Sequence, residues 1–425
     1  MKILSVLMQN QSPRQTVIKN TVWLGSAQVI SRLLKLVLVV VSARLLGPSG
    51  FGTFNYVLSI MSMFFLFSDW GINTLIVRDY QQKSETGKYL NTGMVFKTGL
   101  ALVSLVVAAL GIFVFENREF RAIGLVLAIY LFFENVREFS ATLFRAKQKM
   151  EKEFFVICVE LTSTTAIGIG LLFVYRHVLS LAYAYALGAA LSVVFGVALV
   201  RRSFSIKWEF DTKIVVYYLK QGMPLVLFGL LGFIFFSTDQ IVLGHFRGTE
   251  EVGYYSIASK LVYLAAVLPT IIVGALSPYL AGQVNNQKQI KRIFKVVTSG
   301  LVLLGVLVAG LGTLFSFLIP IFFGAQYLPA IPLFNLLVWV LVFMFPTALL
   351  DTVLVSYHKQ WQDFAITAVC AALNLTLALS LVKIYGAQGV IIATLASQGL
   401  NLVLTLVLSY RAVHSSPPLP LLWQK

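Results

Sequence analysis

Charged side chains inside long apolar stretches are the residues of this sequence that could do chemistry. A charge at mid-membrane costs about 3 kcal/mol or more, so it usually faces a water-filled cavity or an oppositely charged partner. The cationic members are Arg32, Lys35, Arg44, Lys97, Arg137, Lys220 and Lys260, and the acidic members are Asp69, Glu134, Glu138, Glu160, Asp239 and Asp351. Four of them, Arg44, Lys97, Lys220 and Asp351, are expected near span ends, where their polar groups reach interfacial water.

Arg32 and Lys35 are the most informative pair. At about 100° per residue along a helix they share one face with Gln28 and Ser31, whereas Arg44 points away from it. A polar stripe with two cations predicts a cavity wall that meets an anionic ligand. In the alternative interpretation, both cations only neutralise carboxylates on neighbouring helices.

Glu134, Arg137 and Glu138 follow one another at i, i+3 and i+4, which places them on one helix face. Arg137 can largely neutralise Glu134, so a packing role and a transport role both fit this spacing. We predict that these three residues, together with Arg32 and Lys35, bind or guide the transported molecule.

Asp69, Glu160 and Asp239 are candidates for coupling transport to a cation gradient. Protonation of a carboxylate at membrane depth could compensate the movement of charge. Asp239 and Lys260 lie on consecutive expected helices at similar depth. They belong either to the coupling site or to a simple ion pair.

No pattern typical of a nucleotide, metal or catalytic site is visible. The stretch Gly47–Gly52 lacks the Gly-Lys-Ser/Thr ending of a phosphate-binding loop. The four histidines are scattered, without metal-ligand or nucleophile–base spacing. Cys158 and Cys370 fall in apolar stretches and are expected to be packed thiols. We therefore expect no cofactor, no metal and no enzymatic activity.

The elements that must position these residues are membrane-spanning helices. Hydrophobic residues make up 58% of the chain, charged residues only 12%, and the mean hydropathy is +0.85. Repeated apolar runs of this kind predict an all-α polytopic membrane protein with about twelve transmembrane helices. The expected spans are 21–46, 53–77, 91–115, 122–143, 154–175, 178–200, 217–246, 252–281, 296–319, 331–355, 364–382 and 387–410.

The distribution of positive charge predicts the orientation of these spans. Most of the 33 Lys and Arg residues fall in the two tails and in the connections on the same side as the tails. By the positive-inside rule both termini are cytoplasmic. The net charge of +16 then holds the topology and contacts anionic membrane lipids, so it does not call for a nucleic acid partner.

Two related turns indicate an internal repeat. Leu46-Gly47 matches Leu243-Gly244, and Gly52 matches Gly253, each followed by an aromatic-rich helix start. Gly47 can end a helix in a left-handed conformation, and Pro48 cannot continue it. We therefore predict two six-helix bundles, residues 1–213 and 214–425, related as parallel repeats.

The run SARLLGPSGFGTFNYVLSIMSMFFLFSDWGINTLIVRDY, residues 42–80, resembles the N-terminal signature of polysaccharide-biosynthesis membrane proteins. These are Wzx-type flippases, O-antigen flippases among them, of the multidrug/oligosaccharidyl-lipid/polysaccharide exporter superfamily. The most specific part is residues 43–48 followed by Gly50-Phe51-Gly52, and residues 239–255 resemble the counterpart in the second half of the family.

This resemblance implies two bundles around a central cavity that work by alternating access. It also implies a polyprenyl-diphosphate-linked oligosaccharide as substrate, the bacterial cytoplasmic (inner) membrane as location, and a polysaccharide polymerase and chain-length proteins as partners. Diphosphate or acidic sugar would then be the anion that meets Arg32 and Lys35.

Two other functions remain open at this point. A cation-coupled multidrug exporter shares the architecture, but it would favour an acidic or aromatic cavity, whereas the deep charges here include Arg32 and Lys35. A membrane-embedded polysaccharide polymerase or ligase would need a sizeable outer loop, and the expected outer connections are short.

Overall fold

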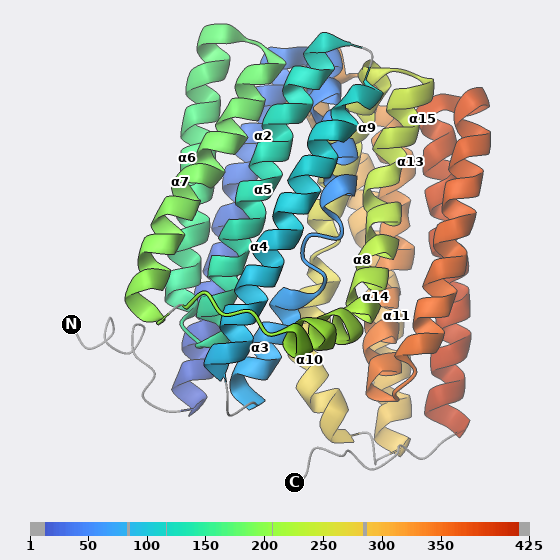
Figure 1. Cartoon of the computed structure of the whole chain (residues 1–425). Coiled ribbons are helices and arrows are strands. Elements are labelled where there is room, and N and C mark those ends of the chain that lie inside the picture. The colour runs from blue at the N-terminus through green and yellow to red at the C-terminus, as the bar shows by residue number, and fades with distance from the viewer. Residues whose placement is uncertain (1–12, 83–85, 116, 206, 284–286, 416–425) are drawn as a thin grey trace. The chain divides into compact units, whose positions relative to one another are not determined.

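The chain is helical almost throughout the part that the structure describes. The computed structural model describes residues 13–82, 86–115, 117–205, 207–283 and 287–415 (Figure 1). The first helices are α2 (Pro13–Phe65), α3 (Ile72–Gln82), α4 (Thr86–Gly111), α5 (Arg118–Ala146), α6 (Met150–Tyr175) and α7 (Val178–Ser203). They are followed by α8 (Thr212–Phe246), α9 (Thr249–Ala265), α10 (Leu268–Gln283), α11 (Gln287–Leu314), α12 (Leu318–Phe323), α13 (Ala330–Leu337), α14 (Leu341–Ser356) and α15 (Gln360–Ser415).

The prediction of an all-α polytopic membrane protein is confirmed. Eight helices in the described ranges are long and apolar enough to cross a membrane. Two of the longest helices each contain a reversal, because α2 leaves helical geometry at Gly47 (φ 69°) and α15 at Gly386 (φ 56°). Helix α5 covers the fourth expected span.

The reversal at Gly47 has the left-handed conformation that the sequence predicts, and Pro48 follows it. The predicted match of Gly47 to Gly244 is wrong. Gly244 lies inside α8, and the left-handed glycine of the second turn is Gly248 (φ 89°), between α8 and α9. Gly248 precedes Gly253 by the same spacing as Gly47 precedes Gly52, so the two turns have equal length.

The chain divides into two compact units, residues 1–233 and 234–425. The division falls inside the continuous helix α8, whereas the predicted domain boundary at residues 213 and 214 falls where α8 begins. The first part of α8 therefore packs with the N-terminal unit.

In the N-terminal unit, α7 packs on α5 and α6, α2 packs on α6, and α3 and α4 pack on α5 (Figure 1). Small residues let the helices approach closely. A Cβ at Gly188 of α7 would lie 2.0 Å from Thr164 Oγ1 of α6, so only glycine fits at this crossing. Val57, Met61 and Leu127 lie in the apolar core of this unit.

The second expected span, 53–77, is not continuous: it breaks at residues 66–71, between α2 and α3. Trp70 (φ 45°) and Gly71 (φ 69°) both have positive φ, which ends helical geometry. The first part of α8 packs against the break, because Trp70 Nε1 donates a hydrogen bond to the Leu219 carbonyl (3.1 Å). An unwound segment at membrane depth exposes backbone polar groups, which is tolerated where it is buried in protein or lines a cavity.

In the C-terminal unit, α14 packs on α10, α11 and α15, and α9 packs on α13. Glu251 of α9 accepts a hydrogen bond from the Ala387 N–H (2.9 Å), directly after the reversal at Gly386. Its other oxygen pairs with Arg247 Nε at 3.0 Å. This carboxylate therefore caps the second half of α15.

Candidate functional site

Arg137 is the centre of a buried group of charges in the N-terminal unit. Its Nε lies 2.7 Å from Glu160 Oε2 and 3.0 Å from Glu134 Oε2, and its Nη2 lies 3.2 Å from Glu138 Oε2. Nη2 also bonds Glu134 Oε1. We call these four residues, from α5 and α6, the Arg137 cluster. All four were predicted site residues, and the structure brings them together.

The Arg137 cluster holds three carboxylates around one guanidinium. Arg137 is 6% exposed and Glu160 8% exposed, so little water reaches them. When all three acids are ionised, the cluster has an excess of negative charge in a medium of low dielectric constant. Such an excess favours the uptake of a proton or another cation.

Lys35 of α2 is a further cation that acts on the Arg137 cluster. Its ammonium acts electrostatically on both Glu134 and Glu160. It forms no ion pair in the described part of the chain, and its side chain is exposed in the isolated protein. The charge of α2 therefore reaches the cluster on α5 and α6.

Arg32 lies one helical turn from Lys35 and is half-buried. Among the described residues it has no carboxylate partner, which distinguishes it from Arg137. The alternative interpretation requires that Arg32 neutralises a neighbouring acid. In the described part of the chain, Arg32 pairs with none of Asp69, Glu134 and Glu138. Arg44 is exposed, as expected for a residue near a span end.

The ion pairs continue from the Arg137 cluster toward the ends of α5 and α6. Arg145 Nη2 lies 3.4 Å from Glu138 Oε1 and 2.5 Å from Glu153 Oε1. Glu153 is only 1% exposed. Sequence analysis did not single out Arg145 or Glu153, although their positions in the α5–α6 hairpin could have suggested the pair.

Asp69 lies in the break between α2 and α3 and pairs with Lys97 of α4. Lys97 Nζ lies 2.7 Å from Asp69 Oδ1 and 2.7 Å from Asn73 Oδ1. The expectation that Lys97 reaches interfacial water is wrong: it is 3% exposed, in the interior of α4, and its partners satisfy its charge. The ammonium also acts electrostatically on Arg137 and Glu138, so Asp69 belongs to the same network of charges.

Polar side chains that sequence analysis did not single out complete this network. Ser68 Oγ donates to Asn135 Oδ1 at 2.8 Å, which connects the break to α5. The sequence does contain a feature that could have identified Ser68, Asn73 and Asn135. They are polar residues inside apolar spans, and a polar side chain in a membrane is costly unless it has a hydrogen-bond partner.

The remaining predicted coupling residues lie in the C-terminal unit. Asp239 of α8 is 1% exposed and accepts hydrogen bonds from the Tyr255 hydroxyl and, at 3.2 Å, from Thr394 Oγ1. Its buried Oδ1 has no hydrogen-bond partner among the described residues. Lys260 is half-buried on α9. The recorded hydrogen bonds of Asp239 thus come from hydroxyl groups of α9 and α15.

Comparison with known proteins decides the family. Residues 17–284 match the family described as "Polysaccharide biosynthesis protein", and residues 224–379 match the family described as "MatE". The chain belongs to the polysaccharide biosynthesis protein family. The first match covers more than half of the chain and runs from the first turns of α2 through α10.

Named relatives of this family member cover most of its length. It is 21% identical over 403 residues to the capsular polysaccharide biosynthesis protein CapF of Staphylococcus aureus, covering 91% of this chain and 97% of the relative. It is 23% identical over 380 residues to the probable low-salt glycan biosynthesis flippase Agl15 of Haloferax volcanii, covering 85% of this chain and 77% of the relative.

Solved transporters share its fold. The lipid II flippase MurJ in an inward closed conformation matches with a TM-score of 0.73 at 19% identity, over 90% of this chain and 86% of that one. An inward-facing multidrug resistance transporter of the MATE family matches with a TM-score of 0.74 at 14% identity, over 93% and 98%. This family member thus has the two-lobed fold of that transporter superfamily, as the resemblance implied.

Proposed function

We propose that this protein is a flippase that moves a polyprenyl-diphosphate-linked oligosaccharide across the cytoplasmic membrane for cell-surface polysaccharide biosynthesis. The observation that carries the proposal is the family match over residues 17–284, supported by relatives named for capsule biosynthesis and for glycan flipping. A transporter of this family moves its substrate and does not convert it. Transport proceeds by alternating access.

In this proposal Arg32 and Lys35 attract the anionic diphosphate or an acidic sugar. Arg32 supports the role because it is half-buried and has no carboxylate partner in the described ranges. A guanidinium can bind two phosphate oxygens at once, whereas an ammonium acts as a point charge. Lys35 connects substrate binding to the Arg137 cluster, because its ammonium also acts electrostatically on Glu134 and Glu160.

The acidic excess of the Arg137 cluster supports coupling to a cation gradient. Glu134, Glu138 and Glu160 share one guanidinium, so a proton taken up at Glu160 leaves Arg137 fully paired with the other two acids. Loss of that proton would then strengthen the attraction of Glu160 for Lys35 and compete with the substrate anion. Asp69, Asp239 and Lys260 of α9 are further coupling candidates.

The positive-inside distribution supports a bacterial inner-membrane protein with both termini in the cytoplasm. There a polysaccharide polymerase and chain-length proteins would receive the flipped substrate on the outer side. Membrane lipids surround the spans.

A second candidate function is export of drugs or other small cations. The match of residues 224–379 to the MatE family and the shared MATE fold favour it. The two proposals differ in the charge that the N-terminal unit offers to the substrate, since Arg32 and Lys35 repel a cationic drug.

Transport by the purified protein in liposomes separates these functions. We expect protein-dependent movement of a fluorescent polyprenyl-diphosphate oligosaccharide into the leaflet protected from an impermeant quencher. We expect no protein-dependent uptake of ethidium. Protein-free liposomes are the control, and ethidium transport without glycan movement would favour the exporter.

A further inference from the structure

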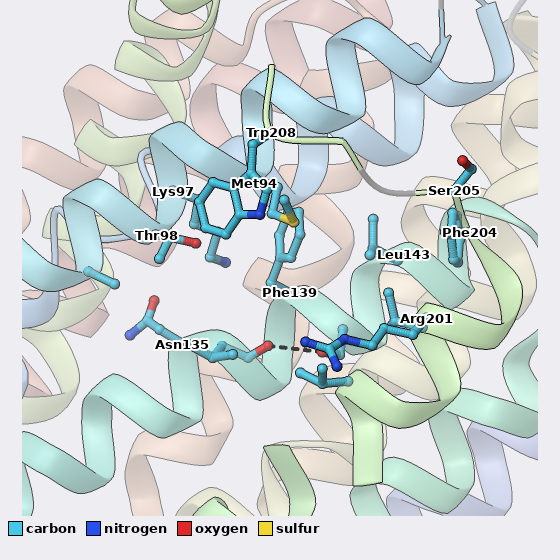
Figure 2. Close-up of a pocket in the computed structure, with 15 residues that line it drawn as sticks. Met94, Lys97, Thr98, Asn135, Phe139, Leu143, Arg201, Phe204, Ser205 and Trp208 are labelled. Carbon is cyan, nitrogen blue, oxygen red and sulfur yellow. Dashed lines mark hydrogen bonds between the residues drawn. The ribbon is translucent and has the colours of Figure 1, made fainter. Parts of the chain in front are cut away.

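A cavity of about 480 Å³ lies within the N-terminal unit, and its described lining contains no residue of the Arg137 cluster. Helices α4, α5 and α7 and the segment after α7 form its walls (Figure 2). On α5 it uses Asn135, Phe139 and Leu143, whereas the Arg137 cluster uses Glu134, Arg137 and Glu138. The two sites therefore occupy different faces of one helix.

The interior of the cavity is mainly apolar, and cations lie at two points of its wall. Phe139, Leu143 and Val197 contribute hydrocarbon surface. Lys97 is deep and already bonded to Asp69 and Asn73. Arg201, near the end of α7, is exposed and has no carboxylate partner among the described residues. Figure 2 shows Arg201 and Lys97 projecting from different helices toward the same space.

The segment after α7 covers the cavity and is held in place by specific contacts. The Lys207 N–H donates to Asn91 Oδ1 of α4 at 3.2 Å, and Lys147 Nζ donates to the Ser203 carbonyl at 2.5 Å. Lys147 also lies 3.8 Å from the ring centroid of Phe204, which lines the cavity. These contacts hold the wall of the cavity that follows α7.

Trp208 lines the cavity from this segment and is 81% exposed. Tryptophan with one apolar face and an exposed edge is typical of the membrane–water interface. The same end of the unit holds Arg202, Lys149 and Lys152 outside the cavity. An apolar space with an unpaired arginine and an interfacial tryptophan at its mouth complements an amphiphile with an anionic head and a hydrocarbon tail.

We propose that this cavity binds one anionic phospholipid of the cytoplasmic leaflet. The phosphate lies on Arg201, and the first part of an acyl chain runs along Phe139, Leu143 and Val197. The inference uses the proposed orientation of the spans, in which α7 ends on the cytoplasmic side, where anionic lipids are abundant. It does not depend on which substrate the protein transports.

The lipid also shields the pair of Lys97 and Asp69. Lys97 lines the cavity and bonds Asp69 in the break between α2 and α3. Filling the cavity with hydrocarbon excludes water from this side of the ammonium, which strengthens its attraction to the carboxylate. A bound phospholipid therefore stabilises the break.

Native mass spectrometry of the full chain in a mild detergent tests the binding. We expect dioleoyl-phosphatidylglycerol to bind more tightly than dioleoyl-phosphatidylcholine. Arg201→Gln should weaken phosphatidylglycerol binding by about fivefold, the effect of one cation near an anionic lipid. Arg202→Gln is the matched control, because Arg202 is also exposed but does not line the cavity, and it should leave the affinity unchanged.

A second pair of variants tests the location. Val197→Phe fills the cavity and should abolish the tight phosphatidylglycerol adduct, whereas Ala198→Phe, on an exposed neighbouring position, should not. If Val197→Phe does not fold, the pair Arg201→Gln and Arg202→Gln still decides, because both side chains are exposed.

Three results would overturn the proposal. Equal affinity for both phospholipids would remove the recognition of the anionic head. Equal losses in Arg201→Gln and Arg202→Gln would indicate general surface charge. Tighter binding of a polyprenyl diphosphate than of phosphatidylglycerol, also lost in Arg201→Gln, would assign the cavity to the transported lipid. Glycan movement in liposomes, measured separately, tests the proposed function without reference to this cavity.

Discussion

At the scale of single residues, Arg137 differs from every other cation in the described spans because three carboxylates surround it. Removing a buried cation leaves its partners unpaired at low dielectric constant, which is more costly than removing one of several acids. Arg137→Gln should therefore lower the free energy of unfolding by about 3–5 kcal/mol. Thermal unfolding of the purified protein measures the change.

Glu160→Gln is the control for Arg137→Gln. Arg137 keeps Glu134 and Glu138 in this variant, and glutamine preserves the size of the side chain. We expect a much smaller loss of stability. If both variants unfold at the same temperature as the unchanged protein, the cluster contributes little to the fold, and its charges act in transport alone.

Arg32 and Lys35 should matter for transport and little for folding. Because neither has an ion-pair partner in the described ranges, Arg32→Ala and Lys35→Ala should abolish most complementation of a flippase-deficient strain while membrane expression persists. Arg32→Lys should already impair it, since lysine cannot bind phosphate in the bidentate way of arginine. Arg44→Ala, on a different face, is the control.

The counter-ion interpretation predicts a different outcome for Lys35. Its charge acts on Glu134 and Glu160, so removing Lys35 together with Glu160 would restore a neutral balance. Full rescue of complementation in Lys35→Ala/Glu160→Gln would show that Lys35 balances the cluster and does not recognise the substrate.

At the scale of elements, the break between α2 and α3 depends on Gly71. Its φ of 69° is strained for any residue with a side chain, and a Cβ there would lie 2.7 Å from Leu225 Cδ1 of α8. Gly71→Ala should lower the free energy of unfolding by about 2 kcal/mol. Thermal unfolding again provides the measurement.

Gly99→Ala is the matched substitution within α4. Among the described residues, no atom outside the neighbouring backbone of α4 lies within 4 Å of a Cβ built at Gly99, so alanine should be neutral or stabilise the helix by up to about 1 kcal/mol. Equal effects of the two variants would contradict the view that the break requires glycine at position 71.

The spans were predictable because apolar runs long enough to cross a membrane can be seen directly in the order of the residues. The left-handed turn at Gly47 was predictable from Gly-Pro chemistry. The break at residues 66–71 was not, because hydropathy averages over a whole span and does not register positive φ at Trp70 and Gly71.

The charged site was predictable only in part. The spacing of Glu134, Arg137 and Glu138 placed them on one face, and their ion pairs are present. To predict Glu160 as the third acid of the cluster, one would need to know how α6 packs on α5, and no local sequence pattern shows this packing. To predict that Lys97 is buried, one would need to know that Asp69, its partner, lies in a break of the helix that the sequence does not show.

At the scale of the whole molecule, the charge distribution predicts that residues 78–90, 144–153 and 201–216 face the cytoplasm. After replacement of Cys158 and Cys370, a cysteine at Lys149 or Ser84 should resist an impermeant thiol reagent added outside intact cells. Ser84 lies outside the described residues, and Lys149 lies in the turn between α5 and α6. A cysteine at the exposed Arg118, at the opposite end of α5, should react. Labelling at Lys149 from outside would reverse the orientation.

The final prediction is that the molecule uses an ion gradient to drive flipping. The substrate anion and the acidic excess of the Arg137 cluster compete for the same cations, so a proton or sodium ion must neutralise a carboxylate when the substrate leaves. An imposed proton or sodium gradient should therefore accelerate glycan movement in liposomes.

Variants of the two units locate the coupling. Glu160→Gln mimics a protonated acid and should leave gradient-independent exchange intact while the response to the gradient is lost. Asp239→Asn makes the same change at a buried carboxylate of the C-terminal unit, whose Oδ1 has no hydrogen-bond partner in the part of the chain that the structure describes. Loss of the response in only one variant assigns the coupling to that unit, because each substitution leaves the other carboxylate in place. If the unchanged protein moves the glycan at the same rate with and without either gradient, coupling is refuted. The carboxylates would then serve to hold Arg137 and the hydroxyl groups of α9 and α15 in position.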